Sequence, residues 1–315
     1  MYILGVEFTA HTFGCGIVNE KGEVLANAFD RYESAAGGMI PHLIAQHHQQ
    51  VAEKVLQQAF TDAKLSWKEM EFIAYSAGPG LDPSLWAGYN IVKAWAQKQK
   101  KKLVGINHCA AHLSIGKIYN HLDDPCYLYV SGVNTQIVVY EAGKYRVVGE
   151  TLDLGLGNML DKFGRIMGLG FPAGPKIEEL AKKGKYVELP YVVKGMDASF
   201  SGILTKVEQL LKKGVSKEDL CFSLQETCFA MMTEVAERAM AHTEKKELLL
   251  VGGVGANKRF CEMLAIMCKE RGATFYKVPL SLAGDQGAMI AWEGYLRRKE
   301  SGDMEVNPHW RVDEV

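Results

Sequence analysis

The sequence predicts an α/β protein made of two similar halves, and three observations lead to this fold class. Short apolar runs typical of buried strands alternate with longer segments whose apolar residues recur at helical spacing. The order strand, polar turn, strand, hairpin, strand occurs once from residue 2 and again from residue 126. The 315 residues suffice for two domains of ordinary size. We therefore expect a duplicated fold, with one domain over residues 1–120 and a second, carrying helical insertions, over residues 121–315.

The first half contains three strands joined by short turns, then helices that alternate with two further strands. The polar segment 19–23 forms the hairpin between the second and third strands. Asp82 is expected to cap the second helix, because Pro83 then occupies the first helical position. The predicted strands are 2–7, 13–18, 24–29, 71–75 and 103–106, and the predicted helices are 42–64, 83–97 and a helix that begins at residue 108.

The second half repeats the opening strands and then becomes richer in helix. Residues 200–207 fit neither the helical nor the strand period clearly. Residues 284–287 open a last helix, and no low-complexity linker separates the elements. The predicted strands are 126–130, 136–140, 145–152, 248–251 and 274–278, and the predicted helices are 155–167, 176–183, 217–243, 258–271 and 288–298.

The composition is that of a globular protein, with 48% hydrophobic and 23% charged residues. The formal net charge is −1, so no overall field draws the chain to nucleic acid. Seven dispersed cysteines without a Cys-x-x-Cys pair favour a reducing compartment. No basic leader followed by an apolar stretch opens the chain, and no apolar run is long enough to span a bilayer. We expect a cytoplasmic protein with no membrane partner.

The first candidate site is a pair of histidines in the segment Asn107-His108-Cys109-Ala110-Ala111-His112. His108 and His112 are four residues apart where a strand ends and a helix begins, so both imidazoles can reach one metal ion. The alternative is chance, because nine histidines make one such spacing unremarkable. Cys109 occupies the position of the general base in the zinc-protease helix, so peptide hydrolysis is not expected.

Asp285 is the candidate third ligand. It lies at a predicted helix start, where capping of the helix is the alternative role for a carboxylate. The strand end that bears His108 and His112 belongs to the other predicted half. We therefore expect Asp285 to face the two imidazoles across a cleft, forming a three-ligand metal site.

Glycine-containing turns after three predicted strands are candidates for binding a nucleotide. Hydroxyl and N–H groups of the turn 131–135 suit a phosphate, and the glycines of 252–257 let the backbone approach a flat ligand. Asp161 and Glu178 offer carboxylates that suit ribose hydroxyls. Each turn alone is weak evidence, because most glycine turns only reverse the chain. None matches the Walker loop or the dinucleotide motif, but their repetition at matching positions favours a nucleotide-binding protein.

With these segments assembled, the chain resembles the tRNA N6-adenosine threonylcarbamoyltransferase family, which includes bacterial TsaD and the archaeal and eukaryotic KEOPS catalytic subunit. The resemblance runs nearly end to end, and the many ordered matches make it specific. The segments that carry it are Gly5-Val6-Glu7-Phe8-Thr9-Ala10-His11-Thr12, Gly78-Pro79-Gly80-Leu81, Asn107-His108-Cys109-Ala110-Ala111-His112, Tyr129-Val130-Ser131-Gly132-Val133-Asn134-Thr135-Gln136, Gly157-Asn158-Met159-Leu160-Asp161, Gly174-Pro175-Lys176-Ile177-Glu178, Gly252-Gly253-Val254-Gly255-Ala256-Asn257 and Gly284-Asp285-Gln286-Gly287.

This resemblance implies an actin, sugar kinase and Hsp70 type of fold (ASKHA), with two lobes and a nucleotide cleft between them. It implies transfer of a threonylcarbamoyl group from threonylcarbamoyl-AMP to N6 of adenosine-37 in tRNAs that read ANN codons. One divalent metal, Fe²⁺ or Zn²⁺, is implied together with ATP, ADP or the adenylate, with or without Mg²⁺. By match, the metal ligands are His108, His112, Tyr129 and Asp285, and the nucleotide-binding residues are Tyr129, Val130, Ser131, Gly132, Val133, Asp161, Gly174, Glu178 and Asn257.

Three positions depart from the family pattern. Val133 replaces a second glycine of the phosphate turn, and Phe8 and Trp86 stand where a small residue and an arginine are usual. Val133 still supplies its backbone N–H, so we expect a change in affinity rather than a loss of function. In the implied reaction the metal acts as a Lewis acid, and no residue identifies itself as the general base.

The resemblance also implies partners: tRNA, a small kinase or ATPase on the C-terminal lobe and a small subunit near the N-terminal helices. The chain carries only short lysine runs, so we expect that it does not hold tRNA tightly by itself. Two alternative functions stay open from the sequence. One is a small-molecule kinase of the same fold, and the other is an ATP-binding, metal-containing scaffold of a complex.

Overall fold

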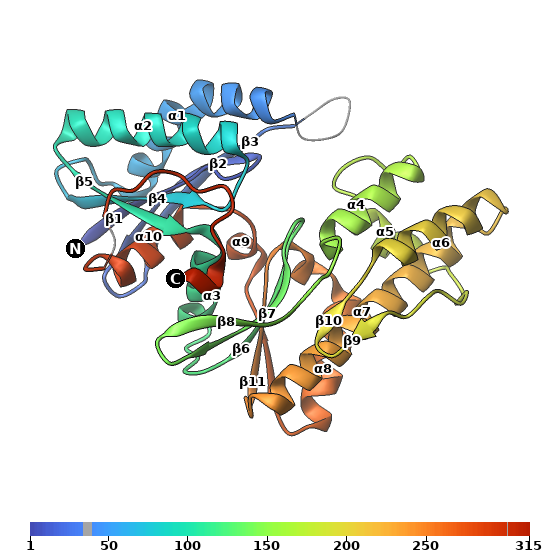
Figure 1. Cartoon of the computed structure of the whole chain (residues 1–315). Coiled ribbons are helices and arrows are strands. Elements are labelled where there is room, and N and C mark those ends of the chain that lie inside the picture. Colours follow the sequence, from blue (N-terminus) through green and yellow to red (C-terminus); the bar gives the residue numbers. More distant parts are fainter. Residues whose placement is uncertain (34–39, 301) are drawn as a thin grey trace. The chain divides into compact units, whose positions relative to one another are not determined.

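The computed structural model describes residues 1–33, 40–300 and 302–315, and the chain forms two compact units (Figure 1). Unit 1 consists of residues 1–118 together with 284–315, and unit 2 consists of residues 119–283. Each unit contains one five-stranded mixed sheet. The division near residue 120 matches the expected boundary, but residues 284–315 return to the first unit instead of staying with the second. The expected domain of residues 121–315 is therefore not continuous in this structure.

The sheet of unit 1 has the strand order β3-β2-β1-β4-β5. Strands β1 (Tyr2–Glu7), β2 (Thr12–Asn19) and β3 (Val24–Arg31) are antiparallel neighbours, whereas β4 (Met70–Gly78) and β5 (Lys102–Asn107) run parallel to β1. Helices α1 (Pro41–Ala63) and α2 (Asp82–Gln99) pack together on one face, and α10 (Gly287–Arg297) covers the other (Figure 1). Parallel strands buried on both faces explain the nearly continuous apolar runs in β4 and β5.

Glycines form the surface on which α10 packs. A Cβ added to Gly5 would lie 2.2 Å from the Ala291 nitrogen, and one added to Gly16 would lie 2.1 Å from the Ala288 nitrogen. On the helix side, a Cβ added to Gly287 would likewise lie 2.1 Å from the Gly16 nitrogen. Real Cβ atoms do not come so near to backbone, so only glycine allows this helix to lie against β1 and β2. This contact is the physical reason why the last helix joins unit 1.

After α10 the chain crosses the sheet as an irregular segment, residues 302–312, which contains a turn at residues 308–309 and which we call the C-terminal strap. The Gly105 N–H donates to the Gly302 carbonyl at 2.9 Å, so the strap begins beside β5. Further along, the Asn307 N–H donates to the Ala77 carbonyl at 2.7 Å, and Val306 is buried. In Figure 1 this red segment runs over β4 and β5 and ends near α3 (His108–Tyr119).

The sheet of unit 2 has the strand order β12-β11-β6-β7-β8, and its opening strands repeat the antiparallel arrangement of unit 1. Helix α7 (Lys217–His242) lies in the core, where Leu224, Cys228 and Met231 are fully buried. The strands are β6 (Cys126–Val130), β7 (Thr135–Glu141), β8 (Lys144–Glu150), β11 (Glu247–Val251), β12 (Thr274–Lys277) and the short pair β9 (Val193–Lys194) and β10 (Asp197–Ala198). The helices are α4 (Leu156–Ile166), α5 (Gly174–Ala181), α6 (Ser201–Lys212), α7 (Lys217–His242), α8 (Lys258–Glu270) and α9 (Leu280–Ala283).

The predicted elements agree with the structure to within a few residues, with three informative differences. Residues 201–207 of the ambiguous segment belong to helix α6, and Phe200 occupies its cap position. Asp82 is the first residue of α2 rather than its cap, because Leu81 occupies the cap position without a side-chain hydrogen bond. The short strands β9 and β10, the short helix α9 and the strap were not predicted. In the part of the chain that the structure describes, no helix combines the length and apolar content needed to cross a bilayer.

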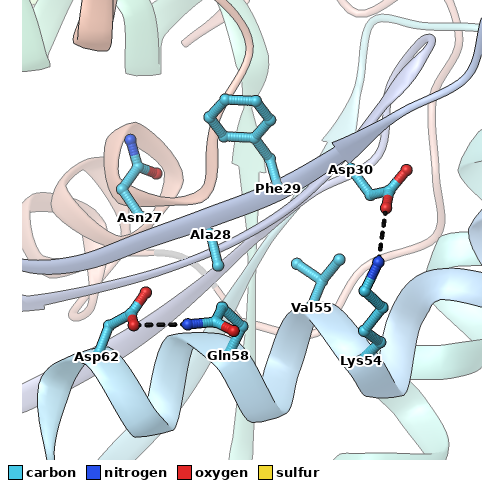
Figure 2. Close-up of a pocket in the computed structure, with 8 residues that line it drawn as sticks. All are labelled: Asn27, Ala28, Phe29, Asp30, Lys54, Val55, Gln58 and Asp62. Atoms are coloured by element: carbon cyan, nitrogen blue, oxygen red, sulfur yellow. Dashed lines mark hydrogen bonds and ion pairs between the residues drawn. The ribbon is translucent and has the colours of Figure 1, made fainter.

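One pocket of unit 1 lies between β3 and α1 (Figure 2). Four of its polar side chains form two contacts with one another. Lys54 Nζ lies 3.4 Å from Asp30, and the Gln58 amide donates to Asp62 at 2.6 Å. None of the predicted site residues lines this pocket.

Candidate functional site

The two histidines sit at the start of α3, immediately after β5. The Asn107 side chain caps this helix, because its Oδ1 accepts a hydrogen bond from the Ala110 N–H at 3.0 Å. The four-residue spacing then stacks His108 and His112 on one face of the helix, with ring centroids 4.7 Å apart. Both side chains are buried, with 7% and 2% of their surface exposed. The helix therefore presents two imidazoles side by side inside unit 1.

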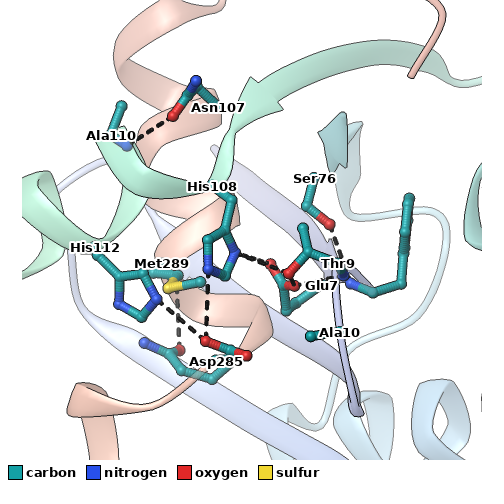
Figure 3. A network of polar contacts seen from close by, with 12 residues as sticks. Glu7, Thr9, Ala10, Ser76, Asn107, His108, Ala110, His112, Asp285 and Met289 are labelled. Carbon is teal, nitrogen blue, oxygen red and sulfur yellow. Dashed lines mark hydrogen bonds and ion pairs between the residues drawn. The ribbon is translucent and has the colours of Figure 1, made fainter. Parts of the chain in front are cut away.

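Asp285 completes a three-residue cluster with these histidines (Figure 3). Its Oδ1 lies 3.2 Å from Nε2 of His112 and 3.5 Å from Nε2 of His108. One ligand atom from each residue lies within 4.8 Å of the others, a spacing that one metal ion can bridge. The capping role considered for Asp285 is wrong, because Gln286 caps α10 by accepting from the Met289 N–H at 3.2 Å.

All three residues of this cluster belong to unit 1, since α10 and the residues before it return to the first sheet. The expectation that Asp285 faces the histidines from the other half is therefore wrong. The fourth expected ligand, Tyr129, lies in unit 2, in strand β6, with 1% of its surface exposed.

Behind His108 lies a second polar pair that the sequence analysis did not single out. Glu7 is fully buried, and its Oε2 is 2.9 Å from His108 Nδ1. The other oxygen, Oε1, accepts from the Thr9 N–H at 2.7 Å and from the Thr9 hydroxyl at 2.5 Å. A proton on Nδ1 directed at Glu7 leaves the lone pair of Nε2 facing Asp285. This carboxylate–histidine arrangement is how proteins orient an imidazole toward a metal.

The charges of the cluster shift the pKa values of its members. Burial lowers the pKa of His108, but the carboxylates of Glu7 and Asp285 outweigh this effect and raise it to about 9. Burial and the neighbouring His108 lower the pKa of His112. Burial raises the pKa of Asp285, yet the His112 hydrogen bond and the charge of His108 hold it well below its usual range. The carboxylates of Glu7 and Asp285 thus favour a positive charge beside His108. A bound divalent cation would provide positive charge there.

The donor set fits such a cation. Two imidazole nitrogens and a carboxylate oxygen are ligands of zinc and of non-haem iron, whereas Ca²⁺ and Mg²⁺ prefer oxygen alone. Three protein ligands leave a further coordination position, which either the predicted fourth ligand or a substrate atom can occupy.

The glycine turns predicted to bind a nucleotide meet within unit 2. The Gly157 N–H donates to the Ser131 carbonyl at 3.1 Å, and the Asn158 N–H donates to the Gly132 carbonyl at 2.8 Å. A Cβ added to Gly252 would lie 2.3 Å from the Val130 carbonyl oxygen, so this turn packs directly on the end of β6. Three segments that are far apart in the sequence therefore gather at the carboxyl end of β6, the usual place for a ligand in such a sheet. Val133 is 71% exposed at the tip of this group.

The predicted nucleotide-binding side chains already make hydrogen bonds within unit 2. Asp161 Oδ1 accepts from the Ala173 N–H at 2.8 Å, directly before Gly174. Glu178 Oε1 accepts from the Lys258 N–H at 2.9 Å. Asn257 caps α8 through the Phe260 N–H, and its amide donates to Gln225 at 2.6 Å. These bonds hold the loops in place, and the role of the same residues toward a ribose stays a prediction.

Sequence reasoning missed Glu7, Thr9 and Gln286 as parts of the site. For Glu7 a signal was present, because a carboxylate ends a strand whose other residues are apolar or glycine. A charged residue that ends a buried strand needs a partner, and here the partner is His108. No local signal distinguishes Gln286 from Asp285 as the helix cap, since aspartate is the more common cap residue.

Solved structures with this fold define the class of protein. Component A of (R)-2-hydroxyglutaryl-CoA dehydratase from Acidaminococcus fermentans matches with a TM-score of 0.59 and 14% identity, over 94% of this chain and 99% of that one. HypF from T. kodakarensis matches with a TM-score of 0.63 and 14% identity, over 94% of this chain and 47% of that one. The chain is thus a two-unit ASKHA-type α/β protein, which confirms the predicted fold class.

The sequence comparisons give the family. The TsaD profile, described as tRNA N6-adenosine threonylcarbamoyltransferase, matches residues 23–292. A protein of that name from Thermococcus kodakarensis is 50% identical over all of this chain and 98% of its own length, and one from Archaeoglobus fulgidus is 48% identical over 100% and 98%. This chain belongs to the tRNA N6-adenosine threonylcarbamoyltransferase family and is a transferase, as the resemblance implied.

Longer relatives exist as well. A Methanocaldococcus jannaschii protein named a probable bifunctional tRNA threonylcarbamoyladenosine biosynthesis protein is 47% identical to this chain. The chain spans 60% of that protein's length.

Proposed function

We propose that this chain transfers the threonylcarbamoyl group from threonylcarbamoyl-AMP to N6 of adenosine-37 in tRNAs that read ANN codons. Full-length similarity at about half identity to enzymes of that name carries the proposal. The buried His108–His112–Asp285 cluster supports it, since a reaction at a carbonyl benefits from a Lewis acid. The enzyme acts in the cytoplasm in this proposal.

The proposed metal ligands are His108, His112 and Asp285, with Tyr129 as the fourth predicted ligand, and the metal is Zn²⁺ or Fe²⁺. When bound, the metal supplies a Lewis acid that polarises the carbonyl of the threonylcarbamoyl group. Glu7 and Thr9 fix the orientation of His108, so that its Nε2 stays directed at Asp285. The amine of adenosine is a weak nucleophile, and positioning of the two substrates supplies much of the rate.

Unit 2 holds the nucleotide in this proposal. The turn from Tyr129 to Val133 supplies backbone N–H groups to phosphate, and Asp161 and Glu178 bind ribose hydroxyls. Gly174 and Asn257 complete the set of predicted nucleotide-binding residues. The ligand is threonylcarbamoyl-AMP, ATP or ADP, with Mg²⁺ where a polyphosphate is present.

The chain acts with partners in this proposal. With a net charge of −1 and only short lysine runs, the chain is not expected to hold tRNA tightly by itself, so additional subunits supply positive charge for tRNA. We propose KEOPS-type subunits: a small kinase or ATPase on unit 2 and a small subunit on unit 1. The bifunctional names of longer relatives are consistent with a second activity joined to this one.

The test is reconstitution. The purified chain, with and without the partner subunits, is incubated with ANN-decoding tRNA, threonine, bicarbonate, ATP and the adenylate-forming enzyme, and nucleosides are then analysed. Modified adenosine that depends on the chain supports the proposal. Metal binding and ATP binding without any modified nucleoside in the full complex would instead indicate a scaffold, and phosphorylation of a small molecule would indicate a kinase.

A further inference from the structure

The C-terminal strap, residues 302–312, packs closely against the sheet of unit 1 at two glycines. A Cβ added to Gly78 would lie 1.9 Å from the Asn307 carbonyl oxygen, and one added to Gly105 would lie 2.4 Å from Met304 Cγ. Both strands therefore carry glycine at the points where the strap crosses them. A segment that merely rested on the surface would not need these two positions to lack side chains.

Polar contacts fix the beginning of the strap. The buried Tyr75 hydroxyl accepts from the Met304 N–H at 2.9 Å and lies 3.1 Å from Asp303 Oδ1. The Tyr89 hydroxyl donates to the same aspartate oxygen at 3.2 Å. These contacts tie the strap to β4 and α2, and the Gly80 N–H continues the series by donating to the Pro308 carbonyl at 3.2 Å.

The far end of the strap reaches the start of the histidine helix through one side chain. The Asn107 amide nitrogen donates to the carbonyls of Trp310 and Arg311 at 3.2 and 3.3 Å. Its oxygen caps α3 through the Ala110 N–H. Asn107 is 2% exposed and directly precedes His108 (Figure 3). One amide thus joins the strap to the first turn of the helix that carries both histidines.

We propose that Asn107 is a positioning residue of the metal centre and that the strap acts through it. The strap orients the amide, the amide fixes the first turn of α3, and that turn sets where the imidazoles of His108 and His112 point. This inference rests on the proposed metal site. Ligand atoms must be held within about half an ångström of their productive positions, so loss of the link between strap and helix weakens metal binding.

The substitution Asn107→Asp isolates the link. Aspartate has the same shape and still caps α3, but it replaces the donor with an oxygen that faces two carbonyl oxygens. The new negative charge next to the histidines would by itself strengthen binding of a cation. The proposal predicts the opposite, a loss of Zn²⁺ affinity of about tenfold, at the lower end of the range for residues that orient metal ligands. The sign of the change therefore separates positioning from simple charge.

Two further variants complete the design. Asn307→Asp adds the same charge on an exposed strap residue and leaves the bonds of Asn107 intact, so its Zn²⁺ affinity should equal that of the unsubstituted protein. Asn107→Ser adds no charge and keeps a capping oxygen, but it is too short to reach the strap. It should lose affinity like Asn107→Asp, and it serves as the test if the aspartate variant does not fold.

Zn²⁺ affinity is measured by competition with a chromophoric chelator on the full chain, and hydrogen exchange follows the strap. The expected result is faster exchange over residues 310–312 together with weaker Zn²⁺ binding in both Asn107 variants. Unchanged or tighter Zn²⁺ binding in variants whose strap exchanges faster would overturn the proposal. Failure of the unsubstituted protein to bind Zn²⁺ or Fe²⁺ at all would instead refute the metal site on which the inference rests.

Discussion

Glu7→Gln is the substitution that tests most directly how the metal centre is organised. Glutamine has the size of glutamate, so the buried space is unchanged, and its oxygen still accepts from the Thr9 N–H and hydroxyl. Its NH₂ group then faces His108 Nδ1, where the carboxylate now lies at 2.9 Å. An NH₂ donor requires Nδ1 to accept, which places the imidazole proton on Nε2 and removes the lone pair that a metal needs.

The magnitude has two parts of opposite sign. Loss of the partner that orients a metal-binding histidine costs about 10- to 100-fold in affinity, or roughly 1.4–2.7 kcal/mol. Glu7 also raises the pKa of His108 toward about 9, so protons compete with the metal at neutral pH. Glu7→Gln lowers this pKa and relieves the competition. The net loss is therefore largest near pH 9, where little proton competition is left in either protein, and it shrinks as the pH falls toward 7.

The assay is a Zn²⁺ competition titration at several pH values between 7 and 9. The affinity of the unsubstituted protein should rise steeply with pH up to about 9, whereas that of Glu7→Gln should rise less and stay lower at pH 9. Thr9→Val is the control for the pH effect alone. It removes a hydroxyl that contacts both Glu7 and His108 but keeps the carboxylate, so its affinity should fall while its pH slope matches that of the unsubstituted protein. Equal affinity of Glu7→Gln and the unsubstituted protein at pH 9 would show that the carboxylate does not orient His108.

Three other substitutions test the remaining features. Replacing both His108 and His112 with alanine should abolish stoichiometric metal by elemental analysis while the circular dichroism spectrum stays native; full occupancy would refute the site. Glu178→Ala should weaken ATP binding by about 1–3 kcal/mol in calorimetry, whereas Glu179→Ala on the same helix should not; equal affinities would remove Glu178 from the nucleotide site. Gly16→Ala should lower the melting temperature and metal affinity together, because a Cβ there displaces α10 and with it Asp285. Gly202→Ala, whose Cβ meets no atom within 4 Å, is its control, and an equal effect of both would contradict the packing argument.

The histidine pair was predictable because the information is local. A four-residue spacing after an apolar strand fixes both the face of the helix and the end of the sheet where the site lies. The position of Asp285, in contrast, could not be predicted from the residues next to it in the sequence. Its neighbour Gln286 takes the capping role, and this choice depends on how α10 sits on Gly5 and Gly16 in the folded protein.

The overall order of helices and strands was predictable from periodicity, but the membership of each element in a unit was not. The sequence of α10 predicts a helix, but its consecutive buried residues, Gly287 to Gly294, give no indication of which sheet it packs on. The strap has no period at all, and its clearest traces in the sequence are two glycines, Gly78 and Gly105, that belong to other strands. The role of these two glycines can be recognised only once the structure shows that the strap crosses them.

The discontinuity of unit 1 has a consequence for how the protein is made. The ribosome synthesises the elements from β1 through α3 first, then all of unit 2, and only afterwards α10 and the strap. At about 5–20 residues per second, synthesis of residues 119–283 takes roughly 10–30 s. During that interval the nascent first sheet exposes the face that α10 will cover, and His108 and His112 lack Asp285. The proposed metal site therefore gains Asp285, its third ligand from unit 1, only near the end of translation, after unit 2 has had time to fold.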